Sequence, residues 1–349
     1  MAYSYKYYTP YTERQKKRAF KKRLTRWKKY MLAALCAVVG LCAAAITASQ
    51  LVGGPLPTWR EIYALCAAPP AVSAESEVPD AATRIHFIDM GQADATLIEQ
   101  DGEFCLIDAG GMGSKQALLD YLDAAGVKNI KLLVMTHEHA DHIGAMAAVL
   151  EHYNVERVLL PDFSNSEAPN GYTILRTLEL IDVQGVPDVT AKQGDTYAIG
   201  SGTLTVLSSG IPTNEKNNTS VITMFTAGSF RYLSCGDAQE EETSVLLESG
   251  ADVHADVYKA AHHGASDANS ISWLRAVAPQ CVIVSCGRDN TFGHPHKSAL
   301  DAFAALGAVV YRTDENGTVI VSVDAAGNLH STAERIAETA EENRVEQAA

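Results

Sequence analysis

The segment most able to do chemistry is 137–142, which reads HEHADH and carries four side chains of metal-binding type in six positions. They are His137, His139, Asp141 and His142. Imidazole and carboxylate groups are the ligands that Zn²⁺ prefers, and Mn²⁺ or Fe²⁺ also accept them. Alternate side chains of an extended loop point the same way, so His137 and His139 should share one side. Asp141 and His142 then turn toward a second position. The spacing therefore predicts a site for two divalent metal ions, Zn²⁺ or Mn²⁺.

A polar loop whose histidines cluster by coincidence is the alternative interpretation. It would have to gather three of the eleven histidines of the chain into six residues, directly after the apolar run 132–135. Histidine and carboxylate side chains grouped this closely are usually metal ligands or catalytic groups. We therefore interpret the segment as part of a metal centre.

The same pattern, H-x-H-x-D-H directly after an apolar strand, resembles the metallo-β-lactamase superfamily. Three further segments agree with this resemblance in chain order, namely LIDAGG at 106–111, CGD at 235–237 and AHHG at 261–264. The resemblance implies an α/β fold, the αββα sandwich of that superfamily. It also implies that Asp108 orients the metal-binding loop, that Asp237 bridges the two metal ions, and that His262 binds the second one.

A closer similarity is to the hydrolase domain of ComEC-type competence proteins and their standalone relatives. The segments that carry it are FIDMGQADA at 87–95, NNTS at 217–220, HHGAS at 262–266 and GHPH at 293–296. The similar region is 84–323. The similarity implies a nuclease-type phosphodiesterase that cleaves DNA outside the membrane, with a link to DNA uptake.

One position departs from the broad superfamily pattern. A third histidine normally completes the first metal site, but the only histidine between His142 and Asp237 is His152, near the end of the following helix. Asn218 stands about where that ligand would be, and this difference is typical of the ComEC-like group. An amide oxygen is a weaker and harder donor than imidazole. We therefore expect a loosely held first metal, a preference for Mn²⁺, or completion by water or a substrate phosphate.

Three residues outside the HEHADH segment are candidates for substrate contact or leaving-group protonation: Lys259, His263 and His294. Their alternative roles are a solvated charge at a strand end, a hydrogen-bonded neighbour of a metal ligand, and a turn residue before proline. The full set of candidate catalytic residues is Asp141, Asp237, Lys259, His263 and His294.

Three acidic residues near the motifs carry further expectations. We expect Asp94 to face the metal site and Asp89 to fix the loop that bears it, with turn capping as the alternative for both. Glu138 lies between two ligands and is expected to point outward.

Apolar β-type runs and helical runs alternate between residues 84 and 323. Strands are predicted near 84–89, 94–99, 104–108, 131–135, 156–160, 203–208, 219–225, 230–235, 256–261, 281–285, 308–312 and 318–323. Helices are predicted near 114–125, 143–152, 172–182, 239–249, 270–278 and 297–306. This order predicts two packed sheets with helices outside.

The N-terminal region is predicted to anchor the chain in a membrane. Residues 1–30 hold eleven of the 28 Lys and Arg residues and one of the 42 Asp and Glu residues. Residues 31–52 are uncharged and mostly apolar, and a helix of about 22 residues spans a bilayer core of about 30 Å. Because basic flanks stay cytoplasmic, 1–30 should be cytoplasmic, 31–52 a single-pass transmembrane anchor, and the catalytic domain extracytoplasmic. The alternatives are a buried core helix and a cleaved signal that yields a secreted protein.

The rest of the chain is predicted to form three parts. Residues 53–82 read as a linker, 83–330 as the metallo-β-lactamase-like hydrolase domain and 331–349 as an acidic tail. Cys105, Cys235 and Cys281 lie in apolar, strand-like runs, which is typical of small core residues. The sequence does not fix a disulfide.

The charge of the chain and its motifs favour different substrates. Beyond residue 52 the chain carries 17 basic and 41 acidic residues, a net charge near −24, whereas nucleic acids usually require a basic surface. The motif favours phosphodiester hydrolysis by a hydroxide that two metal ions generate, with DNA as the leading substrate. The alternatives are hydrolysis of a small phosphodiester or ester, and a non-catalytic metal-binding envelope module. The sequence names no protein partner.

Overall fold

The computed structural model describes residues 81–335, together with residues 44, 45, 47 and 48, which are helical. The chain divides into two compact units, Met1–Cys66 and Ala67–Ala349. The fold described below is that of residues 81–335, within the second unit.

The predicted N-terminal parts fall mostly beyond this range. The cytoplasmic segment 1–30 lies outside the described residues, as do most of the anchor 31–52 and of the linker 53–82. In the part of the chain that the structure describes, no helix combines the length and the apolar character needed to cross a membrane.

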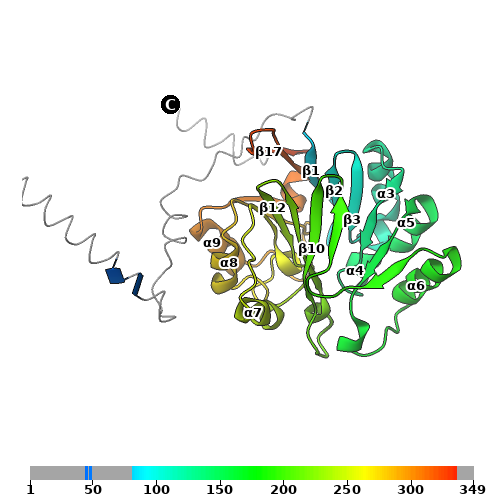
Figure 1. Cartoon of the computed structure of the whole chain (residues 1–349), viewed down its shortest axis with the longest axis horizontal. Coiled ribbons are helices and arrows are strands. Elements are labelled where there is room, and N and C mark those ends of the chain that lie inside the picture. Colours follow the sequence, from blue (N-terminus) through cyan, green and yellow to red (C-terminus); the bar gives the residue numbers. More distant parts are fainter. Residues whose placement is uncertain (1–43, 46, 49–80, 336–349) are drawn as a thin grey trace, which may run out of the picture. The chain divides into compact units, whose positions relative to one another are not determined.

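Two mixed sheets form the centre of the domain (Figure 1). Among residues 81–335, the first sheet has eight strands, in the order β17 (Leu329–Ala333), β16 (Val319–Val323), β1 (Thr83–Phe87), β2 (Thr96–Gln100), β3 (Glu103–Ile107), β5 (Leu132–Val134), β7 (Val158–Leu160) and β8 (Asp188–Thr190). The second has seven, in the order β15 (Val309–Arg312), β14 (Cys281–Val284), β13 (Val257–Lys259), β12 (Phe230–Ser234), β11 (Val221–Ala227), β10 (Gly202–Ser209) and β9 (Thr196–Ile199). Neighbours are parallel from β3 to β8 and from β12 to β15, so each sheet has one parallel half.

Helices cover the outer face of each sheet (Figure 1). The first sheet is covered by α3 (Lys115–Ala124), α4 (Ala140–Ile143), α5 (Met146–His152) and α6 (Tyr172–Gln184), and the second by α7 (Glu240–Glu248), α8 (Ile271–Val277) and α9 (Lys297–Ala305). A third apolar cluster, which includes Phe87, Phe225 and Tyr232, fills the space between the sheets. These layers are the αββα sandwich predicted from the sequence.

Strand β14 shows why its sequence is apolar throughout. All four of its residues are buried. Cys281 and Ile283 belong to the cluster between the sheets, whereas Val282 and Val284 belong to the cluster under the outer helices. Since alternate side chains of a strand point to opposite faces, a strand covered on both faces needs an uninterrupted apolar run.

The helix predicted at 143–152 is divided in two in the structure. Helix α4 ends at Ile143 and α5 begins at Met146. Gly144 lies between them, where an added Cβ would come within 2.2 Å of the backbone nitrogen of Met112. The close approach of the loop that contains Met112 therefore requires glycine here, and the break lets α4 present the metal-binding segment separately.

The C-terminal boundary predicted at residue 330 is wrong. Strand β17 continues through residues 331–333 and pairs antiparallel with β16. Residues 330–333 are small or polar, so the sequence showed no apolar alternation typical of a strand. Leu329 and Ser331 are nevertheless buried. The short edge strands β8 and β9 were missed for the same reason, because their mostly exposed side chains leave little apolar pattern.

The four cysteines in the described part of the chain, Cys105, Cys235, Cys281 and Cys286, are buried free thiols. Burial raises the pKa of the Cys281 thiol to about 12, so it remains protonated near neutral pH. They fill space in the apolar clusters, the role that the sequence predicted for Cys105, Cys235 and Cys281.

Candidate metal centre

The candidate site lies where loops leave the carboxyl ends of strands in both sheets. Asp108 follows β3, the HEHADH segment follows β5, Asp237 follows β12, and His263 follows β13. The first two of these strands are parallel neighbours in one sheet and the last two are parallel neighbours in the other. Parallel strands open their carboxyl ends on a common edge, which brings residues far apart in sequence to one place.

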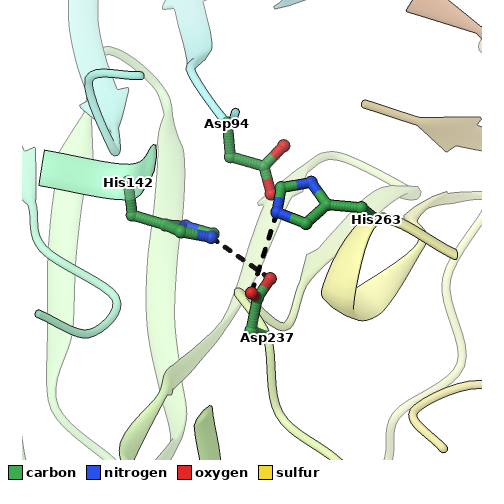
Figure 2. A group of neighbouring side chains, drawn as sticks. All are labelled: Asp94, His142, Asp237 and His263. Atoms are coloured by element: carbon green, nitrogen blue, oxygen red, sulfur yellow. Dashed lines mark ion pairs between the residues drawn. The ribbon is translucent and has the colours of Figure 1, made fainter. Parts of the chain in front are cut away.

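Four buried residues form the larger of two ligand groups (Figure 2): Asp94, His142, Asp237 and His263. One potential ligand atom from each lies within 4.8 Å of the others. His142 Nε2 is 3.2 Å from Asp237 Oδ1, and His263 Nε2 is 3.7 Å from Asp237 Oδ2. We call this set the four-residue group.

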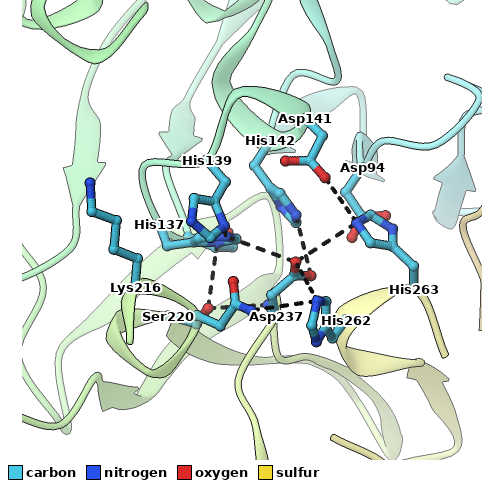
Figure 3. A network of polar contacts seen from close by, with 12 residues as sticks. Asp94, His137, His139, Asp141, His142, Lys216, Ser220, Asp237, His262 and His263 are labelled. Carbon is cyan, nitrogen blue, oxygen red and sulfur yellow. Dashed lines mark hydrogen bonds and ion pairs between the residues drawn. The ribbon is translucent and has the colours of Figure 1, made fainter. Parts of the chain in front are cut away.

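The second group contains His137, His139 and Asp237, and we call it the three-residue group. His137 Nε2 lies 3.0 Å from His139 Nδ1 and 3.9 Å from Asp237 Oδ2. Asp237 therefore belongs to both groups and lies between them, as Figure 3 shows.

Asp108 holds the HEHADH segment in place. Its Oδ1 accepts a hydrogen bond from the backbone N–H of Thr136 at 2.9 Å, and its Oδ2 accepts one from the Thr136 hydroxyl at 2.7 Å. The same Oδ2 lies 2.7 Å from His142 Nδ1. With Nδ1 held by Asp108, His142 directs its Nε2 at Asp237. Asp108 therefore has the position expected of a carboxylate that orients a histidine ligand.

The buried atoms of the four-residue group fit a divalent metal ion. His142 Nε2, Asp237 Oδ1 and Asp94 Oδ1 have almost no solvent contact and no hydrogen-bond partner. Buried polar atoms left in this state are costly, and a bound cation would satisfy them. A set of two imidazoles and two carboxylates also matches the ligands that zinc or manganese takes.

The charges of this group are tightly coupled. Burial alone would raise the pKa of Asp237, but His142 and His263 outweigh it and hold that pKa well below its usual range. Burial opposes protonation of His142, yet Asp237 and Asp108 raise its pKa well above the ordinary value. A divalent cation would take the place of the proton on His142, so metal binding must release protons.

The structure places His263, and not the predicted His262, in the four-residue group. Both residues lie in the short turn η4 (Ala261–Gly264) and have left-handed backbone conformations, with φ of 49° and 52°. The His262 side chain is 21% exposed, with Nε2 4.0 Å from Asp237 Oδ2 and Nδ1 3.3 Å from Asp267 Oδ1. His262 thus lies at the rim of the site, while His263 is buried inside it.

The structure also places Asn217, and not the predicted Asn218, toward the site; both residues lie in η3 (Lys216–Thr219). The Asn218 side chain turns away from the ligand groups, because its Oδ1 accepts the backbone N–H of Gln239 at 2.9 Å and its Nδ2 lies 3.2 Å from Glu241 Oε2. Asn217 is the one that faces the site: its Nδ2 is 3.4 Å from His262 Nε2, and its buried Oδ1 has no partner. Asn218 therefore does not occupy the position of the absent third histidine.

Lys259 and Asp94 form a buried ion pair beside the four-residue group. Lys259 Nζ donates to Asp94 Oδ2 at 2.6 Å and to the carbonyl oxygen of Ala260 at 2.9 Å. Only 2% of the Lys259 side chain is exposed. Its ammonium group therefore positions Asp94 and is not free to contact a substrate. The substrate contact predicted for Lys259 from the sequence does not fit this position.

Asp141 and His294 lie at the edge of the four-residue group. Asp141 Oδ2 is 3.3 Å from His263 Nε2, and its side chain is 37% exposed. Burial, together with neighbouring His262 and His263, lowers the pKa of His294 to about 4. Its ring is therefore neutral near pH 7.

Two further expectations from the sequence concern the side chains of Glu138 and Asp89. The Glu138 side chain does not point outward: it is 6% exposed and forms an ion pair with Lys216, a residue that sequence reasoning missed. Nothing in the spacing around Lys216 links it to the site. Asp89 does fix its loop, since its Oδ1 accepts the backbone N–H of Gly91 and its Oδ2 accepts from Arg335.

Fold and site together define a class of protein. The profile of the metallo-β-lactamase superfamily matches residues 88–288, and the chain belongs to this superfamily. Within it, the chain is similar to ComEC-type competence proteins.

Two such relatives illustrate the similarity. ComE operon protein 3 of Bacillus subtilis (strain 168) is 29% identical over 270 residues, which cover 72% of this chain and 33% of that protein. Competence protein ComA of Neisseria gonorrhoeae is 25% identical over 248 residues, which cover 69% of this chain and 32% of that protein. The chain thus spans about a third of the length of these relatives. Among solved structures, the metallo-β-lactamase fold protein YhfI of Bacillus subtilis aligns with a TM-score of 0.47 and 12% identity, over 68% of this chain and 98% of that one.

Proposed function

We propose that the chain is a two-metal phosphodiesterase that cleaves DNA outside the membrane. The observation that carries this proposal is the position of Asp237, whose carboxylate is common to both ligand groups. One carboxylate shared between two divalent ions holds them a few ångströms apart, the separation of two-metal sites that act on phosphate esters.

The residues of the chain would divide the work as follows. The four-residue and three-residue groups would hold the two ions, Zn²⁺ or Mn²⁺, which supply an activated water and neutralise charge on the phosphoryl oxygens. Lys259 fixes Asp94, and Asp108 fixes His142, so the ligands are in position before substrate arrives. Asp141 and His294, at the edge of the four-residue group, would be available for contact with the substrate.

The proposed location follows from the N-terminal sequence. A basic segment at 1–30 and an apolar segment at 31–52 favour a single-pass anchor with a cytoplasmic N-terminus. The catalytic domain would then meet DNA on the outer side of the membrane. The similarity to proteins named for competence supports a role in DNA uptake.

A second candidate is hydrolysis of a small phosphodiester or ester. The observation that favours it is charge, because residues 81–335 carry 15 basic and 33 acidic side chains. A domain of this charge lacks the basic surface that usually binds a phosphate backbone. The His and Asp side chains gathered in the two ligand groups in turn disfavour a non-catalytic metal-binding module.

Turnover of two substrates separates these candidates. The full chain, loaded with Mn²⁺ or Zn²⁺ and analysed for metal content, would be given single-stranded DNA and bis-p-nitrophenyl phosphate. Cleavage of DNA supports the proposal, cleavage of the small ester alone supports the second candidate, and cleavage of neither leaves a binding module. Asp237→Ala is the matched variant, since loss of the ligand common to both groups should reduce cleavage of either substrate.

A further inference from the structure

Three aromatic rings lie in series between the surface and the four-residue group. The ring of Phe292 stacks on that of His294, with centroids 5.7 Å apart and planes 23° apart. The ring of His294 stacks in turn on that of His263, at 6.2 Å and 24°. His263 is buried and His294 nearly so, whereas Phe292 is 64% exposed.

The loop that carries Phe292 is held at both ends. The side chain of Asn290 donates to the carbonyl oxygens of Gly287 and His294, at 2.9 and 2.5 Å, and accepts the backbone N–H of His294 at 3.0 Å. Gly287 is fixed in addition by its N–H bond to Gln92 Oε1 at 2.9 Å. The exposure of Phe292 is therefore built into an ordered loop.

The alignment of Phe292 distinguishes it from other exposed apolar side chains. A single exposed apolar residue, such as Val183 at 73%, needs no special explanation. Phe292 differs because one face of its ring is already parallel to a ring of the site, while the side chain stays largely open to solvent. A flat aromatic group could stack on its open face, and the ring of Phe292 is linked to that of His263 by two stacking steps, of 5.7 and 6.2 Å.

We propose that Phe292 is a stacking platform for a nucleobase within a few nucleotides of the scissile phosphate, so that single-stranded nucleic acid is the substrate class. This inference rests on the proposed phosphodiesterase function. Bases in a duplex are already stacked and paired, whereas a single strand offers free base faces to aromatic side chains. Stacking also needs no basic surface, which matches a domain with 15 basic and 33 acidic residues.

The test compares two oligonucleotides that differ only in their bases. One is a short single strand, and the other has the same backbone with abasic sites flanking the scissile phosphate. With the metal-loaded full chain, Phe292→Ala should reduce kcat/KM on the first by about tenfold or more, within the range known for loss of one stacked base. Cleavage of the abasic strand should not change.

Two variants serve as matched controls. Phe292→Tyr keeps a stacking ring and should retain the rate on the base-containing strand. Val183→Ala removes an exposed apolar side chain from α6 and should leave both rates unchanged. An equal loss on both strands in Phe292→Ala would mean that the ring acts only through His294, and no loss on either would mean that it does not contact substrate; both results overturn the inference.

A binding measurement separates this inference from the proposed function. The fluorescence of 2-aminopurine in a single strand should be quenched by the wild-type chain and much less by Phe292→Ala, with or without added Zn²⁺. If the wild type cleaves no DNA but shows this difference, the phosphodiesterase proposal fails and the stacking platform stands. Equal quenching by both proteins overturns the platform.

Discussion

The two ligand groups share Asp237 but differ in how their other residues are held. In the four-residue group every member is buried, His142 is braced by Asp108, and Asp94 is braced by Lys259. In the three-residue group His139 is partly exposed, and the position normally held by a third histidine is not filled by Asn218. Ligands fixed by neighbouring hydrogen bonds bind metal more tightly, so we expect the four-residue group to fill first.

The difference also bears on how each group would complete its coordination. The three-residue group offers fewer ligands, so a metal ion there would need water or a phosphate oxygen as well. His262 and Asn217 lie nearby: His262 Nε2 is 4.0 Å from Asp237 Oδ2, and Asn217 Oδ1 is buried and unpartnered. We therefore expect one tightly held ion and one loosely held ion, because the shared carboxylate has unequal surroundings.

The change expected to have the largest effect removes the shared ligand. Asp237→Ala should lower the metal content of both groups and reduce turnover by at least about 1,000-fold, because electrostatic stabilisation of the phosphoryl group is lost. Metal analysis, a turnover assay and circular dichroism would check the result. A folded variant that keeps its activity would show that Asp237 is not shared between two ions.

The next comparison uses the adjacent histidines of η4. His263→Ala should lose the tightly bound ion, with metal affinity reduced by at least about 100-fold, whereas His262→Ala should retain it. Equilibrium dialysis against Zn²⁺ measures both. The reverse result would restore His262 as the ligand that the sequence suggested.

A smaller effect is expected from the residue that braces the four-residue group. Asp108→Asn keeps the shape of the side chain but removes the charge beside His142, so metal affinity should fall about 10- to 100-fold. Titration with Zn²⁺ should show weaker binding at the four-residue group and little change in affinity at the three-residue group. Equal weakening of both sites would mean that Asp108 supports the whole loop and not His142 in particular.

The smallest expected effect concerns Glu242, a buried residue of α7 that accepts the Ser208 hydroxyl at 2.6 Å. Burial raises its pKa well above the ordinary value. The protonated form therefore stabilises the fold at low pH, and this contribution is lost as pH rises from the unfolded pKa through the higher folded one.

Glu242→Gln cannot ionise and should be more stable than wild type above the folded pKa. The gain should reach about 1.4 kcal/mol for each pH unit by which the folded pKa exceeds the unfolded one. Urea unfolding of the metal-free proteins between pH 4 and 8 measures it. A constant difference between the two proteins across this range would contradict the raised pKa.

The sequence predicted the layered fold because buried strands and amphipathic helices repeat with different periods. Strand β14, apolar throughout, was found where expected, whereas β17 has a single large apolar residue, Leu329, and was missed. The HEHADH segment could be located in advance, since its ligands are local. The resemblance assigned the metal ligand to His262, whereas the structure brings His263 into the group. Spacing could not correct this, because the left-handed backbone of both residues breaks the alternation that assigns side chains to faces.

Burial of the four thiols bears on how the domain can be produced. Since Cys105, Cys235, Cys281 and Cys286 are all free, residues 81–335 need no oxidant to mature, and either a reducing or an oxidising compartment leaves the same covalent chain. Refolding from denaturant should proceed without thiol–disulfide exchange. Folding of residues 81–335 would thus not depend on the redox state of the surrounding compartment.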